Sequence, residues 1–401
     1  MSEASEKQTS DHSNEDSASH RMRAVSTAAL YMVIAVCAQA AGSATPDSDA
    51  SRSQQQSRRT LEQFVKDGTT KSCYDRASQP HTAVTDLHFH SQPFGGPSIP
   101  YQEQMRYLDR TGVRFVLLYG IGQQLPHDSS CTYYLDCIGT PAKPGIKNDF
   151  ENAANYVEYP QSDIHVALSM TFPDLANPDA IVEGIHLLDK EYPNLFQWMG
   201  ELNLHKEALR GNGHVPASID DIARWKDFMR ILEERRIPLA LHSDLGDDDD
   251  HAENLHLMQE VLGLYPNNTI VWMHMGLSRE LMKMDPRKHI DLMSRHLDEN
   301  PNLLLDISWT VLSEGYFDTH EKRSLYVEFF NAYPTRILAG TDFVAAGNKT
   351  FEIYWNEASI TGEILSHLDD NAFRAIALGQ NYFDLVPTLT GKFEAPPICR
   401  E

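Results

Sequence analysis

The chain is poor in cysteine and in positive charge, and each shortage excludes a class of protein. Only five cysteines occur in 401 residues. No two of them form a C-x-x-C pair, which argues against a cysteine-based zinc site. Lysine and arginine number 34 against 57 aspartate and glutamate residues, so the formal net charge is −23. Nucleic-acid binding needs a basic face, so we expect no nucleic-acid partner and attribute the acidity to solubility.

The apolar run 24–38 is short for a membrane span. It follows Arg21-Met22-Arg23 and precedes small residues, with cleavage expected after Ala40 or Ala44. This order is typical of a secretory signal peptide. We therefore expect a periplasmic or secreted protein with no stable membrane insertion after cleavage. An uncleaved anchor and a lipoprotein signal around Cys37 are the alternatives.

Composition divides the chain into four parts. Residues 1–44 are a polar leader followed by the signal peptide, and 45–80 are a polar linker with an N-terminal extension. Residues 81–388 have the composition of one large soluble domain. Residues 389–401 form a C-terminal tail.

Signal cleavage would remove Cys37 and leave an even number of cysteines, which suggests disulfides in an exported chain. Cys131 and Cys137 flank a short loop, so we pair them. Cys73 then pairs with Cys399 and ties the two ends of the folded part together. Four free buried thiols are the alternative.

Short apolar runs alternate with amphipathic stretches after residue 84. We predict helices at 179–191, 218–236, 252–264, 279–300 and 320–333. We predict eight buried strands at 84–90, 114–119, 164–170, 195–201, 238–242, 269–274, 303–307 and 337–340. Eight such units predict an α/β fold, a (β/α)8 TIM barrel forming a single catalytic domain.

An open doubly wound sheet is the rival fold. It should carry a glycine-rich phosphate loop after its first strand. The sequence FGGP at 94–97 is not that loop, because it leads to further prolines and not directly into a helix.

The connection after the second predicted strand, residues 120–149, is unusually long and contains Cys131 and Cys137. In a barrel this loop lies on the face where active sites form. We predict that it is a loop insertion, pinned by a disulfide, that covers the site as a lid. An inert surface loop is the alternative.

Strong metal-ligand residue types stand at the ends of several predicted strands. His88 and His90 are one residue apart on the first strand, so both side chains point to the same face. Single histidines or carboxylates are commonly structural. A whole set at one rim would be costly to bury without a metal ion. The set is His88, His90, Glu201, His242, His274 and Asp342.

These motifs resemble those of the amidohydrolase superfamily, in its amidohydrolase-related branch. The matching segments are DLHFH at 86–90, LH at 241–242, MHMG at 273–276, GTDF at 340–343 and LGQNYFDL at 378–385. The resemblance covers roughly residues 81–387.

The resemblance implies a divalent ion, usually zinc, held by His88 and His90 together with Asp342. His242 and His274 would bind a second ion or act as catalytic helpers, and we assign His274 to both roles. Glu201 resembles the bridging carboxylate of members with two metal ions. We therefore favour two ions over one.

The expected chemistry is hydrolysis of an amide, ester, lactone or phosphoester bond in a small molecule. A divalent ion activates water and polarises the substrate, and Asp342 would act as the general base. Histidine ligands must be neutral, so activity should fall below about pH 6. The alternatives are a decarboxylase with one metal ion, which Glu201 argues against, and a non-catalytic metal-dependent binding protein.

Substrate contacts are harder to locate from the sequence. Arg279 follows the sixth strand and is a candidate to bind a carboxylate. His205 and Lys206 follow Glu201 and are candidates to line the pocket, and Trp309 is a candidate wall. Each has an alternative reading as an ordinary surface or structural residue. The substrate and the oligomeric state stay open, and a homo-oligomer is one option.

Overall fold

The computed structural model describes residues 61–64, 73–77, 84–161 and 163–400. These residues belong to one compact unit, Ser57–Glu401. The predicted leader, the signal peptide and most of the predicted linker lie outside the described residues. None of the helices in the described ranges is long and apolar enough to cross a membrane.

The eight predicted strands are all present in one parallel sheet, with the strand order β8-β7-β6-β5-β4-β3-β2-β1-β9. Their side chains are almost all buried, as expected for strands covered on both faces. The strands are β1 (Thr85–His90), β2 (Phe115–Tyr119), β3 (His165–Met170), β4 (Phe196–His205), β5 (Leu239–Ser243), β6 (Ile270–Trp272), β7 (Leu303–Asp306), β8 (Ile337–Leu338) and β9 (Phe343–Val344).

The sheet closes into a barrel because β8 and β9 are two halves of the eighth barrel strand. β8 pairs with β7, and β9 pairs with β1. Between the two halves, Leu87 N donates to Ala339 O at 3.1 Å and Asp342 N donates to His88 O at 2.7 Å. This confirms the predicted (β/α)8 barrel.

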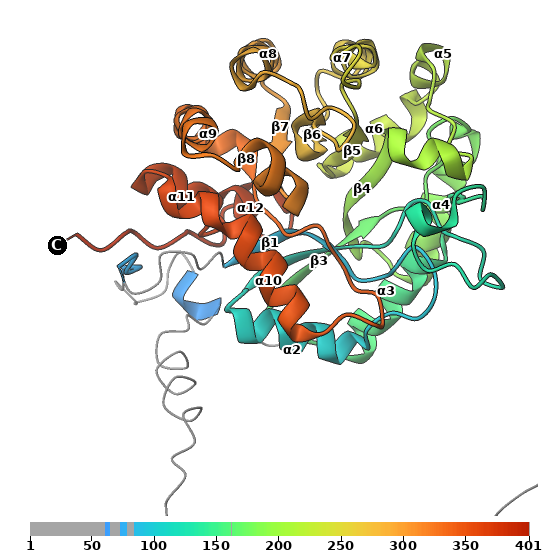
Figure 1. The fold of residues 1–401 in the computed structure, drawn as a ribbon. Coiled ribbons are helices and arrows are strands. Elements are labelled where there is room, and N and C mark those ends of the chain that lie inside the picture. Colours follow the sequence, from blue (N-terminus) through green and yellow to red (C-terminus); the bar gives the residue numbers. More distant parts are fainter. Residues whose placement is uncertain (1–60, 65–72, 78–83, 162, 401) are drawn as a thin grey trace, which may run out of the picture. The chain divides into compact units, whose positions relative to one another are not determined.

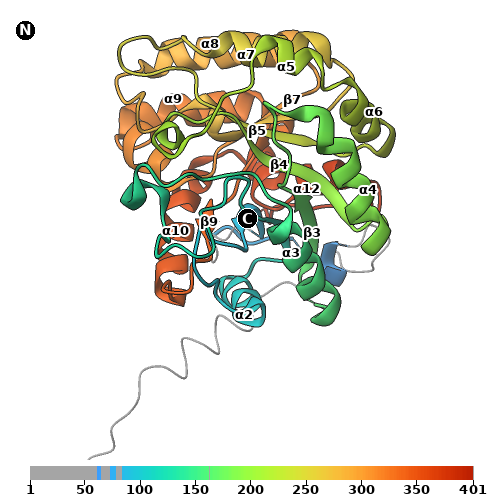
Figure 2. The same cartoon turned by 90° about the vertical axis from the view of Figure 1, so that its right-hand side faces the viewer.

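Helices surround the strands, as Figures 1 and 2 show. The helices are α2 (Tyr101–Thr111), α3 (Lys147–Glu158), α4 (Ile181–Glu191), α5 (Ile219–Ala223), α6 (Lys226–Arg235), α7 (Leu255–Leu264), α8 (Pro286–Glu299), α9 (His320–Ala332), α10 (Phe351–Gly362), α11 (Asp370–Ile376) and α12 (Gln380–Leu385).

Local sequence explains where these helices begin and end. In α2, Tyr101, Met105 and Leu108 recur at helical spacing and are buried. The helix ends at Gly112, whose φ of 91° is in the left-handed region that favours glycine. The helix predicted at 279–300 begins only at Pro286, because Asp285 accepts bonds from two backbone N–H groups and caps it there.

The helix predicted at 218–236 is wrong as one element. The chain forms two helices, α5 and α6, separated by Arg224 and Trp225. Trp225 is fully buried and donates its indole N–H to Leu175 O at 3.1 Å. The break thus falls where a large side chain is anchored inside the barrel wall.

The loop insertion after β2 is confirmed, and Cys131 and Cys137 form the predicted disulfide. Leu125 and Tyr134 of the loop form a small apolar cluster with Phe94, which follows β1, and Leu209, which follows β4. It is also bonded to the segment after β4, since Gly139 N donates to Gly211 O and Ala142 N donates to Asn212 O. The insertion is therefore a packed structure and not a loose loop.

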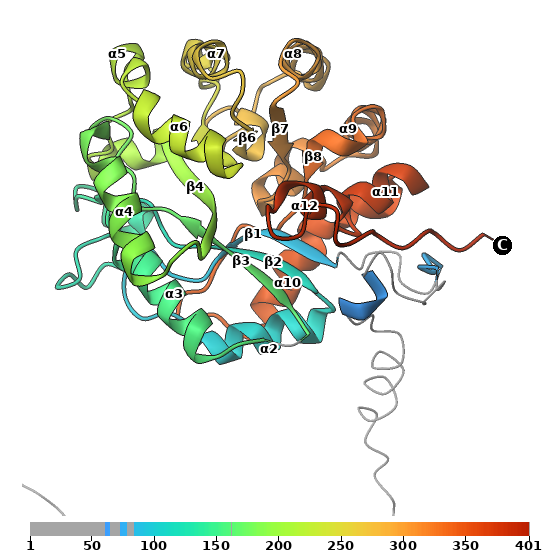
Figure 3. The ribbon, with the colours of Figure 1, turned by 180° about the vertical axis from the view of Figure 1, so that it is seen from behind.

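The second predicted disulfide, Cys73–Cys399, joins cysteines 326 residues apart. Beside it, Tyr74 and Ile398 form a parallel bridge between the N-terminal extension and the C-terminal tail (Figure 3). In the chain-entropy model a cross-link over so long a loop stabilises the fold by roughly 6 kcal/mol.

Candidate metal centre

The structure brings the six predicted ligand residues together at the C-terminal ends of the strands. Three groups of side chains could each hold an ion, with all ligand atoms of a group within 4.8 Å of one another. Two of them share Glu201: one is His88, His90, Glu201 and Asp342, and the other is Glu201, His242 and His274. The third is His88, His274 and Asp306. We call His88, His90 and Asp342 the first half of the centre, and His242 and His274 the second half.

In the first half, two imidazole nitrogens face each other. Nε2 of His88 and Nε2 of His90 are 3.0 Å apart, and Asp342 Oδ1 lies 3.4 and 3.2 Å from them. His90 Nδ1 is 2.6 Å from the carbonyl oxygen of Gly120, which can only accept. Nδ1 of His90 therefore carries a proton, and its Nε2 is the nitrogen available to a metal ion.

In the second half, both histidines face one oxygen of Glu201. His242 Nδ1 lies 2.5 Å from Glu201 Oε1, and His274 Nε2 lies 3.5 Å from the same atom. The other nitrogen of His242, Nε2, is 2.9 Å from Asp244 Oδ1. A carboxylate thus fixes the orientation of this ring from behind.

Glu201 lies between the two halves. Its Oε1 faces the second half, whereas its Oε2 lies 3.8 Å from His88 Nε2 and 3.4 Å from His90 Nε2. One carboxylate therefore presents one oxygen to each half, which is the geometry expected of a bridging ligand.

Three predicted positions differ in detail. Glu201 does not end its strand, since β4 continues to His205 and pairs there with Ser243 of β5. His274 lies just beyond β6 and Asp342 lies between β8 and β9, both in turns with φ values of 53° and 57°. Left-handed backbone at residues other than glycine costs on the order of 1–3 kcal/mol and concentrates at functional sites.

Other buried groups hold these two turns. Asp86 accepts from Thr341 N at 2.9 Å and from Thr341 Oγ1 at 2.8 Å, directly before Asp342. Burial raises the pKa of Asp86 to about 6. On the other side, His289 Nε2 lies 3.0 Å from Met275 O, next to His274. Both turns are thus fixed by groups of the barrel wall.

The donor chemistry of the centre fits a divalent cation. Imidazole and carboxylate groups are the ligands that zinc and neighbouring transition metals take in proteins. Here they are buried together, with ligand side chains between 0 and 14% exposed. Burying so many carboxylates without a cation would be costly.

The pKa shifts of the ligand side chains also favour a bound cation. Burial opposes a positive charge on His88, yet Asp342 and Asp306 outweigh it and raise its pKa well above the ordinary value. In the same way, hydrogen bonds that His274 donates to Asp306 and Glu201 overcome burial and raise its pKa to about 9. Burial alone would raise the pKa of Glu201, but Lys206 and His242 hold it well below its usual range. The carboxylates thus attract positive charge, which protons or a metal ion can supply.

The sequence analysis missed two carboxylates beside the centre. Asp306 is the last residue of β7 and lies 3.3 Å from His274 Nδ1. Asp244 lies two residues after His242 and contacts its ring. A signal for both was present: Asp306 ends a strand, and a residue two positions after a strand ligand shares its face.

The predicted substrate contacts lie at different distances from the centre. The ring of Trp309 is 4.9 Å from that of His274, so Trp309 lies beside the centre. Arg279 is 5.1 Å from the centroid of the Trp309 ring and donates to Tyr133 OH at 3.3 Å. Arg279 therefore lies next to Trp309 and further from the centre. Its bond to Tyr133 connects the disulfide loop to the rim of the barrel.

The residues after Glu201 divide between two roles. The ring of His205 lies 3.1 Å from Glu207 Oε2 and belongs to none of the three candidate metal groups. The ammonium group of Lys206, by contrast, is 3.7 Å from Glu201 Oε1. Lys206 is therefore at the centre, and His205 is not.

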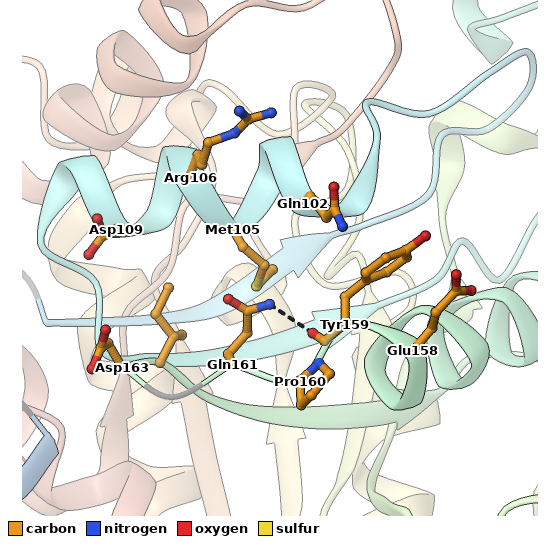
Figure 4. A pocket seen from close by; sticks show the side chains of 10 residues that line it. Gln102, Met105, Arg106, Asp109, Glu158, Tyr159, Pro160, Gln161 and Asp163 are labelled. Atoms are coloured by element: carbon orange, nitrogen blue, oxygen red, sulfur yellow. Dashed lines mark hydrogen bonds between the residues drawn. The ribbon is translucent and has the colours of Figure 1, made fainter.

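A separate groove lies between α2 and the segment that joins α3 to β3 (Figure 4). Gln102 and Met105 of α2 and Tyr159 beyond α3 line part of it. None of the residues lining this groove is a predicted site residue, so the groove is distinct from the centre.

The closed barrel with clustered histidines and carboxylates at its C-terminal rim defines a class of metal-dependent hydrolase folds. A family model described as amidohydrolase matches residues 165–377, which is more than half of the chain. The chain belongs to the amidohydrolase family, whose members use divalent metal ions. This confirms the resemblance inferred from the motifs.

Solved structures with a similar fold are distant in sequence. An amidohydrolase from Burkholderia multivorans with bound zinc is 13% identical, with a TM-score of 0.48, covering 75% of this chain and 98% of that one. A dihydroorotase from Campylobacter jejuni is 11% identical, with a TM-score of 0.45, covering 75% and 81%. An uncharacterized TIM-barrel protein from Bordetella bronchiseptica is 14% identical, with a TM-score of 0.39, covering 72% and 100%. A search of curated proteins found no match.

Proposed function

We propose that the protein is an exported hydrolase that uses two divalent metal ions, with zinc as the first candidate. The observation that carries this proposal is the position of Glu201, whose two carboxylate oxygens face different pairs of histidines. The first half would hold one ion and the second half the other, with Glu201 shared between them.

Divalent ions, when bound, would acidify water and polarise the bond to be cleaved. The protein's own groups would manage the proton. Asp342 would take a proton from the attacking water and deliver it to the leaving group. Its Oδ1 faces the first half and its Oδ2 lies 4.0 Å from His274 Nε2, so this carboxylate reaches both halves.

The substrate would be a small molecule with an amide, ester, lactone or phosphoester bond. Trp309, half-buried beside His274, would form one wall of the binding site. Arg279 forms no ion pair with a carboxylate among the described residues, since its contacts are with Trp309 and Tyr133. It is therefore available to bind an anionic group of the substrate at the rim.

Export to the periplasm or the cell exterior is supported by the two disulfides. Structural disulfides form and persist in oxidising compartments and are rare in reducing ones. Expression of the full chain with fractionation, followed by N-terminal sequencing of the mature protein, tests this. We expect a new N-terminus after Ala40 or Ala44, and an intact N-terminus in the cytoplasm would contradict export.

The test of activity combines metal analysis with turnover on a panel of esters, lactones, amides and phosphoesters. We expect turnover that is lost on treatment with a chelator and restored by zinc. Carbon dioxide release without consumption of water would show a decarboxylase instead. Bound metal without turnover of the panel or any decarboxylation would favour a binding protein.

A further inference from the structure

Asp306 contacts histidines from both halves of the centre. Its Oδ1 lies 3.3 Å from Nδ1 of His274 and 3.6 Å from Nδ1 of His88. The two imidazole rings are stacked, with centroids 5.3 Å apart. The carboxylate is 1% exposed and thus lies behind both rings, away from solvent.

The link from Asp306 to His88 passes through Ser308. Ser308 Oγ donates to Asp306 Oδ1 at 2.6 Å, because an ionised carboxylate only accepts. With its proton committed, the same hydroxyl accepts from Nδ1–H of His88 at 2.8 Å. His88 then carries a proton at Nδ1, and its Nε2, which faces His90 and Asp342, is the nitrogen available to a metal ion.

The link from Asp306 to His274 is direct. Nδ1 of His274 is within 3.3 Å of two acceptors, Asp306 Oδ1 and the carbonyl oxygen of Ser308, so it carries a proton. Its Nε2 is then the nitrogen that faces Glu201, where a metal ion can replace a proton. The backbone N–H of His274 also donates to Asp306 Oδ1 at 3.2 Å, which holds the left-handed turn at this residue.

We propose that Asp306 is a positioning residue that orients one histidine ligand of each metal ion, directly at His274 and through Ser308 at His88. This inference rests on the proposed function, because it assumes an ion in each half. Asp306 is not assigned as a ligand itself. The nitrogens that face it are the Nδ1 atoms, whereas the Nε2 atoms of the same rings face Glu201 and Asp342.

Asp244 provides a matched control. It is equally buried and also contacts a ring nitrogen that points away from the centre, but it reaches only His242 of the second half. Asp306→Asn and Asp244→Asn each remove one buried negative charge. Loss of an outer partner of a histidine ligand typically costs about 10–100-fold in metal affinity. We expect that loss at both ions in Asp306→Asn and at one ion in Asp244→Asn.

The experiment measures zinc per chain by elemental analysis and zinc affinity by competition with a chromophoric chelator. Wild type, Asp306→Asn, Asp244→Asn and Ser308→Ala are compared, and circular dichroism checks that each variant folds. Ser308→Ala should weaken zinc binding mainly in the first half, because at His274 it removes only a 3.4 Å contact with Nδ1 and leaves the direct bond from Nδ1 to Asp306. Asp306→Glu, which keeps the charge, should recover part of the affinity.

The outcomes separate this inference from the function on which it rests. Two ions in wild type and wild-type zinc affinity in Asp306→Asn would overturn the role of Asp306 and leave the proposed function intact. Loss of only one ion in Asp306→Asn, as in Asp244→Asn, would also overturn it. If Asp306→Asn does not fold, unchanged zinc affinity in Ser308→Ala would contradict the link from Asp306 through Ser308 to His88. A wild-type protein that binds no metal would overturn both proposals.

Discussion

The two halves of the centre share Glu201 but differ in what surrounds them. In the first half, the ring nitrogens that point away from the centre are fixed by Gly120 O and Ser308 Oγ, and the facing nitrogens contact only other ligands. In the second half, His242 Nδ1 bonds directly to Glu201, and the ammonium group of Lys206 lies 3.7 Å from the same oxygen. The first half is thus arranged for a cation, whereas the second half already balances its carboxylate with positive charge from the protein. We infer that the second ion binds more weakly.

The largest expected effect concerns Asp342, the proposed general base. Asp342→Asn should lower turnover by about 10²–10⁴-fold, the contribution typical of a general base. The measurement is kcat on the best substrate of the panel. Thermal unfolding of the variant should show that the barrel survives, and turnover near the wild-type value would remove Asp342 from the mechanism.

Metal titration tests the difference between the halves directly. Zinc added to chelator-treated protein should bind in two steps, the first tighter than the second. Binding to the folded state alone stabilises it by about 2.7 kcal/mol when zinc is at 100 times the dissociation constant. Calorimetric titration and thermal unfolding at increasing zinc measure both quantities. Two equal and independent sites would contradict the comparison.

The pH dependence of zinc binding follows from the raised pKa of His274, about 9. In the metal-free protein His274 keeps a proton at neutral pH, and zinc must displace it. Zinc affinity should therefore rise about tenfold per pH unit up to about pH 9 for each proton displaced. Titration in two buffers of different ionisation enthalpy measures the protons released.

The stability of the metal-free protein should change with pH in the opposite direction, falling as the pH rises. Because the folded-state pKa of His274 is raised, its ion pairs with carboxylates contribute fully below about pH 6.5. That contribution is lost as the pH rises through about 9. Chemical denaturation of chelator-treated protein across this range checks the trend. Zinc affinity that does not change between pH 7 and 9 would show that His274 is already neutral.

The smallest effect concerns Lys206. Replacing it by glutamine removes the ammonium group beside Glu201 and should tighten the second zinc step by about tenfold, because repulsion between two cations this close exceeds 1.4 kcal/mol. Lys206→Arg keeps the charge and is the control. Tighter zinc binding in the first step, or no change in either step, would contradict this role of Lys206.

The sequence predicted much of this centre because one rule governs it. In a barrel the C-terminal ends of all strands meet at one rim, so strand positions alone bring His88, His242 and Asp342 together. The same rule applied to β7 would have found Asp306. The predicted strand ran one residue too far, to 307, so its last residue was Ile307 and not Asp306.

Other features were not accessible from local sequence. Aspartate and histidine adopt left-handed backbone more often than most residues, but residue type alone does not locate it at His274 and Asp342, because groups on other elements such as Asp86 hold these turns. The approach of Lys206 to Glu201 depends on how far β4 continues, which its pairing with β5 decides. The contact of Arg279 with Tyr133 joins loops 146 residues apart.

The central claim is that Glu201 bridges two metal ions. The most direct test is the metal content of purified wild type, Glu201→Ala and Glu207→Ala by elemental analysis. Glu207 lies on the same segment, but its side chain contacts His205 and not the centre, so it serves as the control. We predict close to two ions per chain in wild type and Glu207→Ala, falling toward one in Glu201→Ala. One ion per chain in all three proteins would contradict the bridge.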